Sequence, residues 1–291
     1  MDYFLSAEAS AGLEWQVELL IESFQRYGMA ESLVVAMSDS GVIHYPRLHH
    51  VNKHKRSWLF RSQGKRKGFQ PLDQVYALSH CLAAKEISSP YFVLQPHVVL
   101  NAPIYNPLPQ DDVVALSFSP DMTFTMDSVA EEIGPFWEAL RKEKSLYENR
   151  WINLGHVFCL QNFPETLPRI VGRNAELMIV QQIKMGKPVW RQTMRAAWAA
   201  TLAEAVTEYP VAVLANWDLC SSMVENRTTM FIEYDHGMPP DFNKAMFSYA
   251  DGNLFAFGDP IDALRGCIST SNAHQVAQLA GNLVARRSQK P

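Results

Sequence analysis

The chain has 291 residues, of which 47% are hydrophobic and 19% are charged, and its formal net charge is −4. This length suits one large α/β domain or two smaller ones with a substantial core. The acidic balance gives no global attraction to nucleic acid or to anionic membranes. No stretch approaches the roughly 20 apolar residues that span a bilayer, and the start MDYFLSAEAS lacks the features of a signal peptide.

The four cysteines are widely and irregularly spaced and form no CxxC pair. We therefore expect reduced thiols in a soluble, cytoplasmic protein without a membrane partner.

The first elements in chain order are a strand at 2–7, a helix at 12–28 and a strand at 32–41. This order predicts a βαβ unit with a parallel sheet. Because ligands bind outside the carboxyl ends of parallel strands, the polar residues that end both strands lie where a ligand is expected. Helical spacing sets an apolar face against a polar one. The apolar face is Leu13, Val17, Leu20, Ile21 and Phe24, and the polar face is Glu18, Glu22 and Gln25.

The later elements alternate in the same way, and we see no internal repeat or interdomain linker. Helices are predicted at 71–87, 129–140, 175–186 and 189–206, and strands at 91–94, 98–100, 111–119, 153–160 and 228–237. The pattern predicts a single α/β domain over 1–291 with a C-terminal elaboration.

A basic stretch separates the second strand from the next helix. Seven of the 26 lysines and arginines lie between Lys53 and Lys67, with no acidic residue among them, and Trp58 and Phe60 are interleaved. Such a loop can neutralise a diphosphate or contact a nucleic-acid backbone by charge and stacking. The alternative is a solvated loop without a ligand.

Two polar clusters interrupt apolar strands. In FIEYDHGMPPDFNK, alternation places Glu233 and Asp235 on one face and Tyr234 and His236 on the other. Such a group can hold a cation or act as a general base, although solvated turn residues have the same composition. In YFVLQPHVVLNAP the proline predicts that the strand stops or bulges at Gln95. The sequence has no HExxH, GxSxG or glycine-rich dinucleotide motif, which argues against zincins, serine hydrolases and classical dehydrogenases.

Three segments resemble one known family. FLSAEASAGLEWQVELLIESFQR, with the pair Trp15 and Gln16, is similar to the opening of plant hydroxyproline O-arabinosyltransferases and the related peptidyl serine galactosyltransferases. The next landmark of the family is a helix that leads to a strand with its metal-binding acidic motif, and it is similar to PLDQVYALSHCL together with PYFVLQPHVVLNAP. The late strand of the family is similar to MFIEYDHGMPPDFNK. The landmarks are spread from about residue 3 to residue 245. The resemblance implies a GT-A-like, Rossmann-type mixed sheet flanked by helices, which binds a nucleotide sugar and holds a divalent cation through an Asp-X-Asp motif.

This sequence departs from the family at that motif, where it has Gln95, Pro96 and His97. His97 and His236 are then the candidate ligands of Mn²⁺ or Mg²⁺, and Glu233 or Asp235 could supply an oxygen ligand from the facing strand. Otherwise the Lys53–Lys67 stretch balances the diphosphate directly. A third alternative is a site that binds without catalysing.

The resemblance implies a glycosyltransferase that moves a sugar from a nucleotide donor, most readily a UDP-sugar, to a hydroxyl acceptor such as a peptide. Residues 1–120 would form the nucleotide-sugar half and 121–291 the acceptor half. Donor-binding candidates are Ser6, Glu8, Ser38, Asp39, Lys65, Arg66 and Gln95. Candidate catalytic bases are Asp235 and Glu233, with Asp121 and Asp112 behind them. The alternatives are glycosyl transfer onto a modified DNA base and an inactive binding module.

Overall fold

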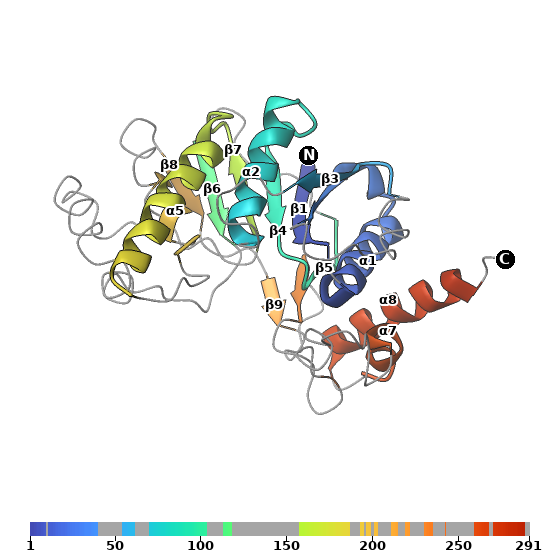
Figure 1. The fold of residues 1–291 in the computed structure, drawn as a ribbon. Coiled ribbons are helices and arrows are strands. Elements are labelled where there is room, and N and C mark those ends of the chain that lie inside the picture. Colours follow the sequence, from blue (N-terminus) through green and yellow to red (C-terminus); the bar gives the residue numbers. More distant parts are fainter. Residues whose placement is uncertain are drawn as a thin grey trace. The chain divides into compact units, whose positions relative to one another are not determined.

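The computed structural model describes part of the chain. Described are residues 1–9, 11–39, 54–61, 70–103, 113–117, 157–186, 193–194, 196–198, 201–202, 211–214, 219–221, 230–234, 242, 259–267 and 270–288. The chain divides into two compact units that interleave along the sequence (Figure 1). Unit 1 comprises 1–2, 69–93 and 108–216, and unit 2 comprises 3–68, 94–107 and 217–291.

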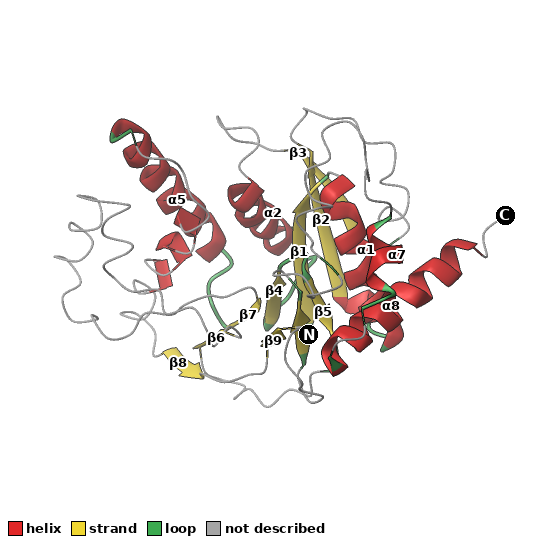
Figure 2. Cartoon of the chain, turned by 90° about the horizontal axis from the view of Figure 1, so that it is seen from below, coloured by secondary structure: helices red, strands yellow, loops and turns green. Residues whose placement is uncertain are grey.

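Unit 2 begins with the predicted βαβ unit. Strand β1 (Asp2–Glu8) leads into α1 (Ala11–Arg26), and a 3₁₀ turn η1 (Ala30–Ser32) precedes β2 (Leu33–Asp39) and β3 (Ser57–Arg61). The strands β1, β2 and β3 are parallel neighbours (Figure 2). The apolar residues of β1 and β2, apart from the terminal positions, are buried on both faces, as is typical of parallel strands, whereas Trp58 of β3 is exposed.

The helix α1 ends because Gly28 adopts a left-handed conformation, with φ of 69°. The amide of Met29 donates to the carbonyl of Phe24 at 2.9 Å, and that of Gly28 donates to Gln25 at 3.0 Å. This arrangement closes the helix in a Schellman-like turn. The ring of Phe24 meets that of Tyr3 edge-on at 4.8 Å, which holds α1 against β1.

A small second sheet completes unit 2. Strand β10 (Phe231–Glu233) lies between β5 (Val98–Leu100), to which it is antiparallel, and β9 (Leu219–Ser221), to which it is parallel. The helices α7 (Pro260–Leu264) and α8 (Ser271–Ser288) pack against each other, and α8 packs against α1. One buried cluster joins these elements. It consists of Trp15, Leu19, Val99, Ile232, Tyr234, Phe242, Ile261, Leu264, Cys267, Ala273, Val276, Leu279 and Ala280.

Unit 1 has its own strand neighbours in the order β4-β7-β6-β8, in which β6 is antiparallel to β7 and parallel to β8. Its elements are α2 (Gln70–Ala83), β4 (Tyr91–Leu94), β6 (Val113–Ser117), β7 (Val157–Gln161), α5 (Leu167–Lys184) and β8 (Val211–Leu214). The helices α2 and α5 pack closely where Gly172 faces the ring of Tyr76. The hydroxyl of Tyr76 donates to Glu176 at 2.7 Å.

The prediction of an α/β fold with a mixed sheet flanked by helices is confirmed. The helix predicted at 175–186 begins earlier, at Leu167, because a proline at its start and Gly172 inside it hide the pattern. Residues 193–194, 196–198 and 201–202 are helical, in agreement with the helix predicted at 189–206. The helix predicted at 129–140 lies outside the described residues. The assignment of 1–120 and 121–291 as two functional halves stays a prediction.

Candidate functional site

The carboxyl ends of β1 and β2 lie side by side. Glu8 is the register partner of Ser38, and the amide of Ala9 donates to the carbonyl of Ser38 at 2.8 Å. Glu8 is partly exposed, whereas Ser38 is buried. Ser6 lies two residues inside β1 and is also buried, and its hydroxyl has no hydrogen-bond partner within the described part of the chain. The structure therefore brings Glu8 and Ser38 to one edge and places Ser6 beneath it.

A tight turn follows β4, and it accounts for the polar interruption in the sequence. Strand β4 ends at Leu94, and the amide of Val98 donates to the carbonyl of Gln95 at 3.3 Å. Pro96 occupies the second position of this four-residue turn, where its fixed φ is favourable and its missing amide hydrogen costs nothing. The prediction that the strand stops at Gln95 is confirmed. We call residues 95–97 the QPH turn.

Tyr234 holds the QPH turn from the facing strand. Its amide donates to the carbonyl of His97 at 3.0 Å, and its hydroxyl donates to the carbonyl of Pro96 at 3.3 Å. The side chain of Tyr234 is fully buried, with its ring centroid 6.0 Å from that of Trp15. Phe242 packs edge-on against the same indole at 5.9 Å. The turn is thus anchored through its backbone, which leaves the His97 side chain for other contacts.

The imidazole of His97 faces the carboxylate of Glu233. His97 Nε2 lies 3.7 Å from Glu233 Oε1, and the two side chains are only 8% and 14% exposed. Glu233 reaches this position because it is the register partner of Val98, the residue after His97, in the antiparallel pair of β10 and β5. The separation is too long for a hydrogen bond. It suits an ion pair, or two atoms that both bind a third atom lying between them. We call these two residues the His97–Glu233 pair.

The pair offers one nitrogen and one oxygen donor, which suits Mn²⁺ or Zn²⁺ better than Mg²⁺. Two ligand atoms about 2.1 Å from one ion lie roughly 3.0 to 3.7 Å apart for bond angles of about 90° to 125°, so their separation of 3.7 Å is at the wide end of that range. Within the described residues no group of three or more potential ligands forms. Asp235 and His236, two predicted site residues, lie outside the described residues.

The basic stretch is not the continuous loop expected from the sequence. Ser57–Arg61 forms β3, so that expectation is wrong for these residues. Lys55 pairs with the Glu31 carboxylate at 2.7 Å, and this contact lowers the pKa of Glu31. Arg56 donates to the Glu31 carbonyl, also at 2.7 Å. These two cations are therefore engaged within the protein, which weakens the DNA-binding alternative.

Buried His54 starts the same segment, and its Nε2 lies 2.6 Å from the carbonyl of Leu33. Burial lowers the pKa of His54. The remaining predicted residues of this region, Lys65 and Arg66, lie outside the described residues, as do Asp112 and Asp121. The side chain of Asp39 is also outside the described set.

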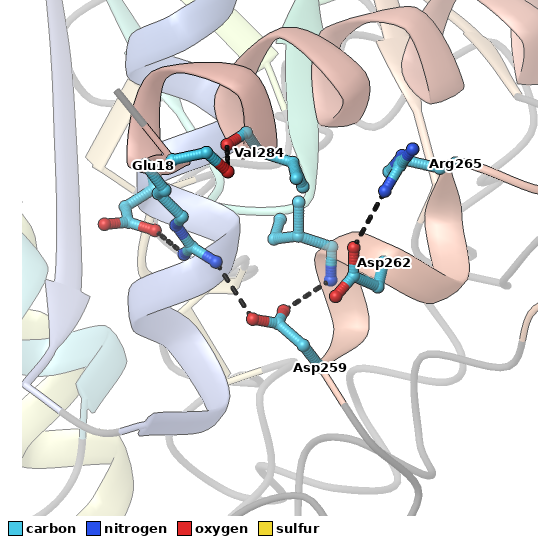
Figure 3. A network of polar contacts seen from close by, with 8 residues as sticks. Glu18, Asp259, Asp262, Arg265 and Val284 are labelled. Atoms are coloured by element: carbon cyan, nitrogen blue, oxygen red, sulfur yellow. Dashed lines mark hydrogen bonds and ion pairs between the residues drawn. The ribbon is translucent and has the colours of Figure 1, made fainter. Parts of the chain in front are cut away.

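Sequence reasoning missed a network that joins α1, α7 and α8 (Figure 3). Arg287 donates both to Glu18 and to Asp259, the latter at 3.0 Å, and Asp259 caps α7 by accepting from the amide of Ile261 at 2.9 Å. One turn farther along α1, Arg286 pairs with Glu22 at 3.1 Å. These five residues form the α1–α8 network.

The glutamates of this network lie on the predicted polar face of α1. Glu18 and Glu22 are nevertheless buried, because α8 packs against α1. Burial raises the pKa of Glu22 more than Arg286 lowers it. Although burial opposes it, the carboxylates of Glu18 and Asp259 raise the pKa of Arg287. The available signal was the spacing of four residues between the glutamates, matched by adjacent arginines near the C-terminus.

Among the described helices, none has the length and apolarity needed to cross a bilayer.

No family model and no curated protein matches the chain. Among solved structures, it is similar to the apo form of the bifunctional glycosyltransferase WbbM, at 13% identity and a TM-score of 0.44. That match covers 80% of this chain and 45% of WbbM, so the chain spans less than half of that protein.

The chain is also similar to the galactosyltransferase LgtC in complex with donor and acceptor sugar analogs, at 9% identity and a TM-score of 0.44, over 97% of this chain and 96% of LgtC. A glycosyltransferase involved in glycosylation of the major capsid of PBCV-1 matches at 8% identity and a TM-score of 0.41, over 80% of this chain and 92% of that one. TM-scores below 0.5 do not fix an activity.

Proposed function

We propose that the chain is a glycosyltransferase that uses a nucleotide-sugar donor and a hydroxyl acceptor. The observation that carries the proposal is the His97–Glu233 pair, two mostly buried ionisable side chains 3.7 Å apart just beyond the carboxyl end of a strand. Paired ionisable groups in such positions are typical of functional sites.

The position of the pair beside a strand end supports this proposal. In open α/β sheets a ligand binds outside the carboxyl ends of the strands. Leu94, the last residue of β4, belongs to unit 2 and leads directly into the QPH turn. In the same unit, Glu8 and Ser38 lie at the carboxyl ends of the parallel strands β1 and β2.

The proposed roles follow from these positions. Glu8 and Ser38 lie where the nucleoside of the donor would bind, with Ser6 beneath them and Asp39 beside Ser38. Gln95 and His97 lie where its diphosphate would pass. Lys65 and Arg66 are proposed to approach the same diphosphate.

In the reaction, a carboxylate accepts the proton of the acceptor hydroxyl while the acceptor oxygen bonds to the anomeric carbon. The bond from that carbon to the diphosphate oxygen breaks, and the nucleoside diphosphate leaves with the bonding electrons. Glu233 is the proposed base, because its carboxylate is partly exposed beside His97. Asp235 is the second candidate.

The donor atoms of this site suit a divalent cation. His97 and Glu233 would supply two ligands and His236 a third, and the ion would supply positive charge opposite the diphosphate. If Glu233 binds the ion, Asp235 would be the base that accepts the proton of the acceptor hydroxyl. Metal dependence therefore distinguishes the two candidate bases.

A ligand panel tests the proposal. We expect one of UDP, GDP and CDP, alone or as its sugar, to raise the melting temperature, since a ligand at 100 times its Kd stabilises by about 2.7 kcal/mol. His97→Ala should remove the shift, whereas His80→Ala, which changes an exposed histidine of α2, should preserve it. If no nucleotide, with or without Mn²⁺, shifts the folded protein, the glycosyltransferase proposal fails and the binding-module alternative takes its place.

A further inference from the structure

The QPH turn depends on one residue for two of its backbone contacts. The carbonyls of Pro96 and His97 both accept hydrogen bonds from Tyr234, the first from its hydroxyl at 3.3 Å and the second from its amide at 3.0 Å. Pro96 and His97 are buried, as is Tyr234. A buried carbonyl without a partner is costly, so these contacts fix the turn in one conformation.

Tyr234 is itself held by aromatic packing in the core of unit 2. Its ring lies 6.0 Å from that of Trp15, and Trp15 also meets Phe242 at 5.9 Å. Trp15 belongs to α1, which follows directly from the carboxyl end of β1. Tyr234 therefore connects the helix that follows β1 to the turn that follows β4.

Glu233 and Tyr234 contact the side chain and the backbone of His97, respectively. Glu233 faces the imidazole at 3.7 Å, while the amide of Tyr234 binds the carbonyl of the same histidine. A shift of the turn would therefore change the geometry of the His97–Glu233 pair without changing either of its members.

We propose that Tyr234 is a positioning residue, whose hydroxyl fixes the QPH turn and thereby sets the imidazole of His97 against the carboxylate of Glu233. Its catalytic importance rests on the proposed glycosyltransferase function, but its effect on His97 does not. Tyr234→Phe isolates the effect, because it retains the ring and the backbone amide and removes the hydroxyl that binds the Pro96 carbonyl.

The primary test is spectroscopic and needs no substrate. In protein labelled with ¹⁵N-histidine, the ring nitrogen shifts of His97 report its tautomer and protonation at a fixed pH. The His97 signals are assigned by their loss in His97→Ala. We expect Tyr234→Phe to move them, and Glu233→Gln to move them as well.

Tyr3→Phe is the matched control, because Tyr3 is equally buried but packs on Phe24. Unchanged His97 signals in a folded Tyr234→Phe protein would overturn the proposal. Trp15→Phe provides a second test if Tyr234→Phe does not fold, since it loosens the packing on Tyr234 and should move the same signals. Unchanged signals in that variant would also overturn the proposal.

The kinetic test follows once a donor is known. Displacement of a catalytic group by about 1 Å can cost up to roughly 100-fold in rate, so we expect a drop in kcat of about 10-fold in Tyr234→Phe, with the donor KM within about twofold. A rise in KM with an unchanged kcat would contradict positioning. Failure of the ligand panel would leave the spectroscopic result standing, so the two proposals fail separately.

Discussion

The α1–α8 network gives the most direct prediction about stability. Arg287→Met retains the apolar stem of the side chain and removes a guanidinium that binds Glu18 and Asp259 (Figure 3). Glu18 is 5% exposed and Arg287 is 28% exposed. The substitution therefore leaves a buried carboxylate without its guanidinium partner.

The magnitude follows from that burial. Removal of one partner of a fully buried pair costs about 3 to 5 kcal/mol. Asp259 is more exposed and its interaction is screened by water, so we expect a loss of about 2 to 3 kcal/mol in the free energy of unfolding. For a chain of this size the corresponding fall in Tm is about 3 to 5 °C.

Urea denaturation, followed by tryptophan fluorescence, measures this loss. Arg265→Met is the matched control, because Arg265 pairs with Asp262 at 3.1 Å on the surface, with both side chains more than half exposed. We expect that control to cost less than about 0.5 kcal/mol. Adding Glu18→Gln to Arg287→Met should restore part of the loss. Equal effects of Arg287→Met and Arg265→Met would refute the reasoning.

Three further predictions concern other buried groups. Burial raises the pKa of Glu22 above 4.5, so the contribution of this group to stability is present below that pH and is lost as the pH rises through the folded-state pKa. Glu22→Gln should therefore flatten the dependence of the urea midpoint on pH between 4.5 and 7. An unchanged dependence would argue against burial as the cause. Gly172→Ala places a Cβ 3.1 Å from the ring of Tyr76, whose hydroxyl is hydrogen-bonded to Glu176. We therefore expect thermal unfolding to show a loss of about 1 kcal/mol in the free energy of unfolding, despite the better helix propensity of alanine. A stabilised variant would show that the ring moves aside. Burial raises the pKa of the Cys159 thiol to about 12, so maleimide labelling followed by mass spectrometry should find it unreactive in the native protein, and labelling as fast as in urea would contradict its burial.

Most strands could be predicted because their apolar runs are short and end at polar residues. β1, β2, β4 and β5 begin and end within a few residues of their predicted bounds. β3 could not, because Lys55 and Arg56 precede it and made its residues read as part of a charged loop. Strand pairing with β2 and the contact with Glu31 outweigh that local charge.

The candidate site was predictable in part. The sequence placed Glu233 and His97 at strand ends, but only the antiparallel register of β10 and β5 brings their side chains together. Tyr234 was assigned to the face opposite Glu233, and its complete burial agrees with that assignment. Its contacts with the QPH turn depend on residues more than 130 positions apart, which no local pattern encodes.

The burial of Glu18 and Glu22 could not be foreseen from periodicity alone. A helix with carboxylates on one face ordinarily exposes that face. Here the last helix of the chain supplies Arg286 and Arg287, and these cations compensate the buried charges. The polar face of α1 is therefore an interface.

The central claim is sugar transfer from a nucleotide donor, and the most direct measurement is release of nucleoside diphosphate from UDP-, GDP- and CDP-sugars, with and without Mn²⁺. We predict release from at least one donor, a loss of at least about 100-fold in His97→Ala, and an unchanged rate in His80→Ala. Absence of release from every donor, in a folded protein that also shows no shift in the ligand panel, would contradict the account.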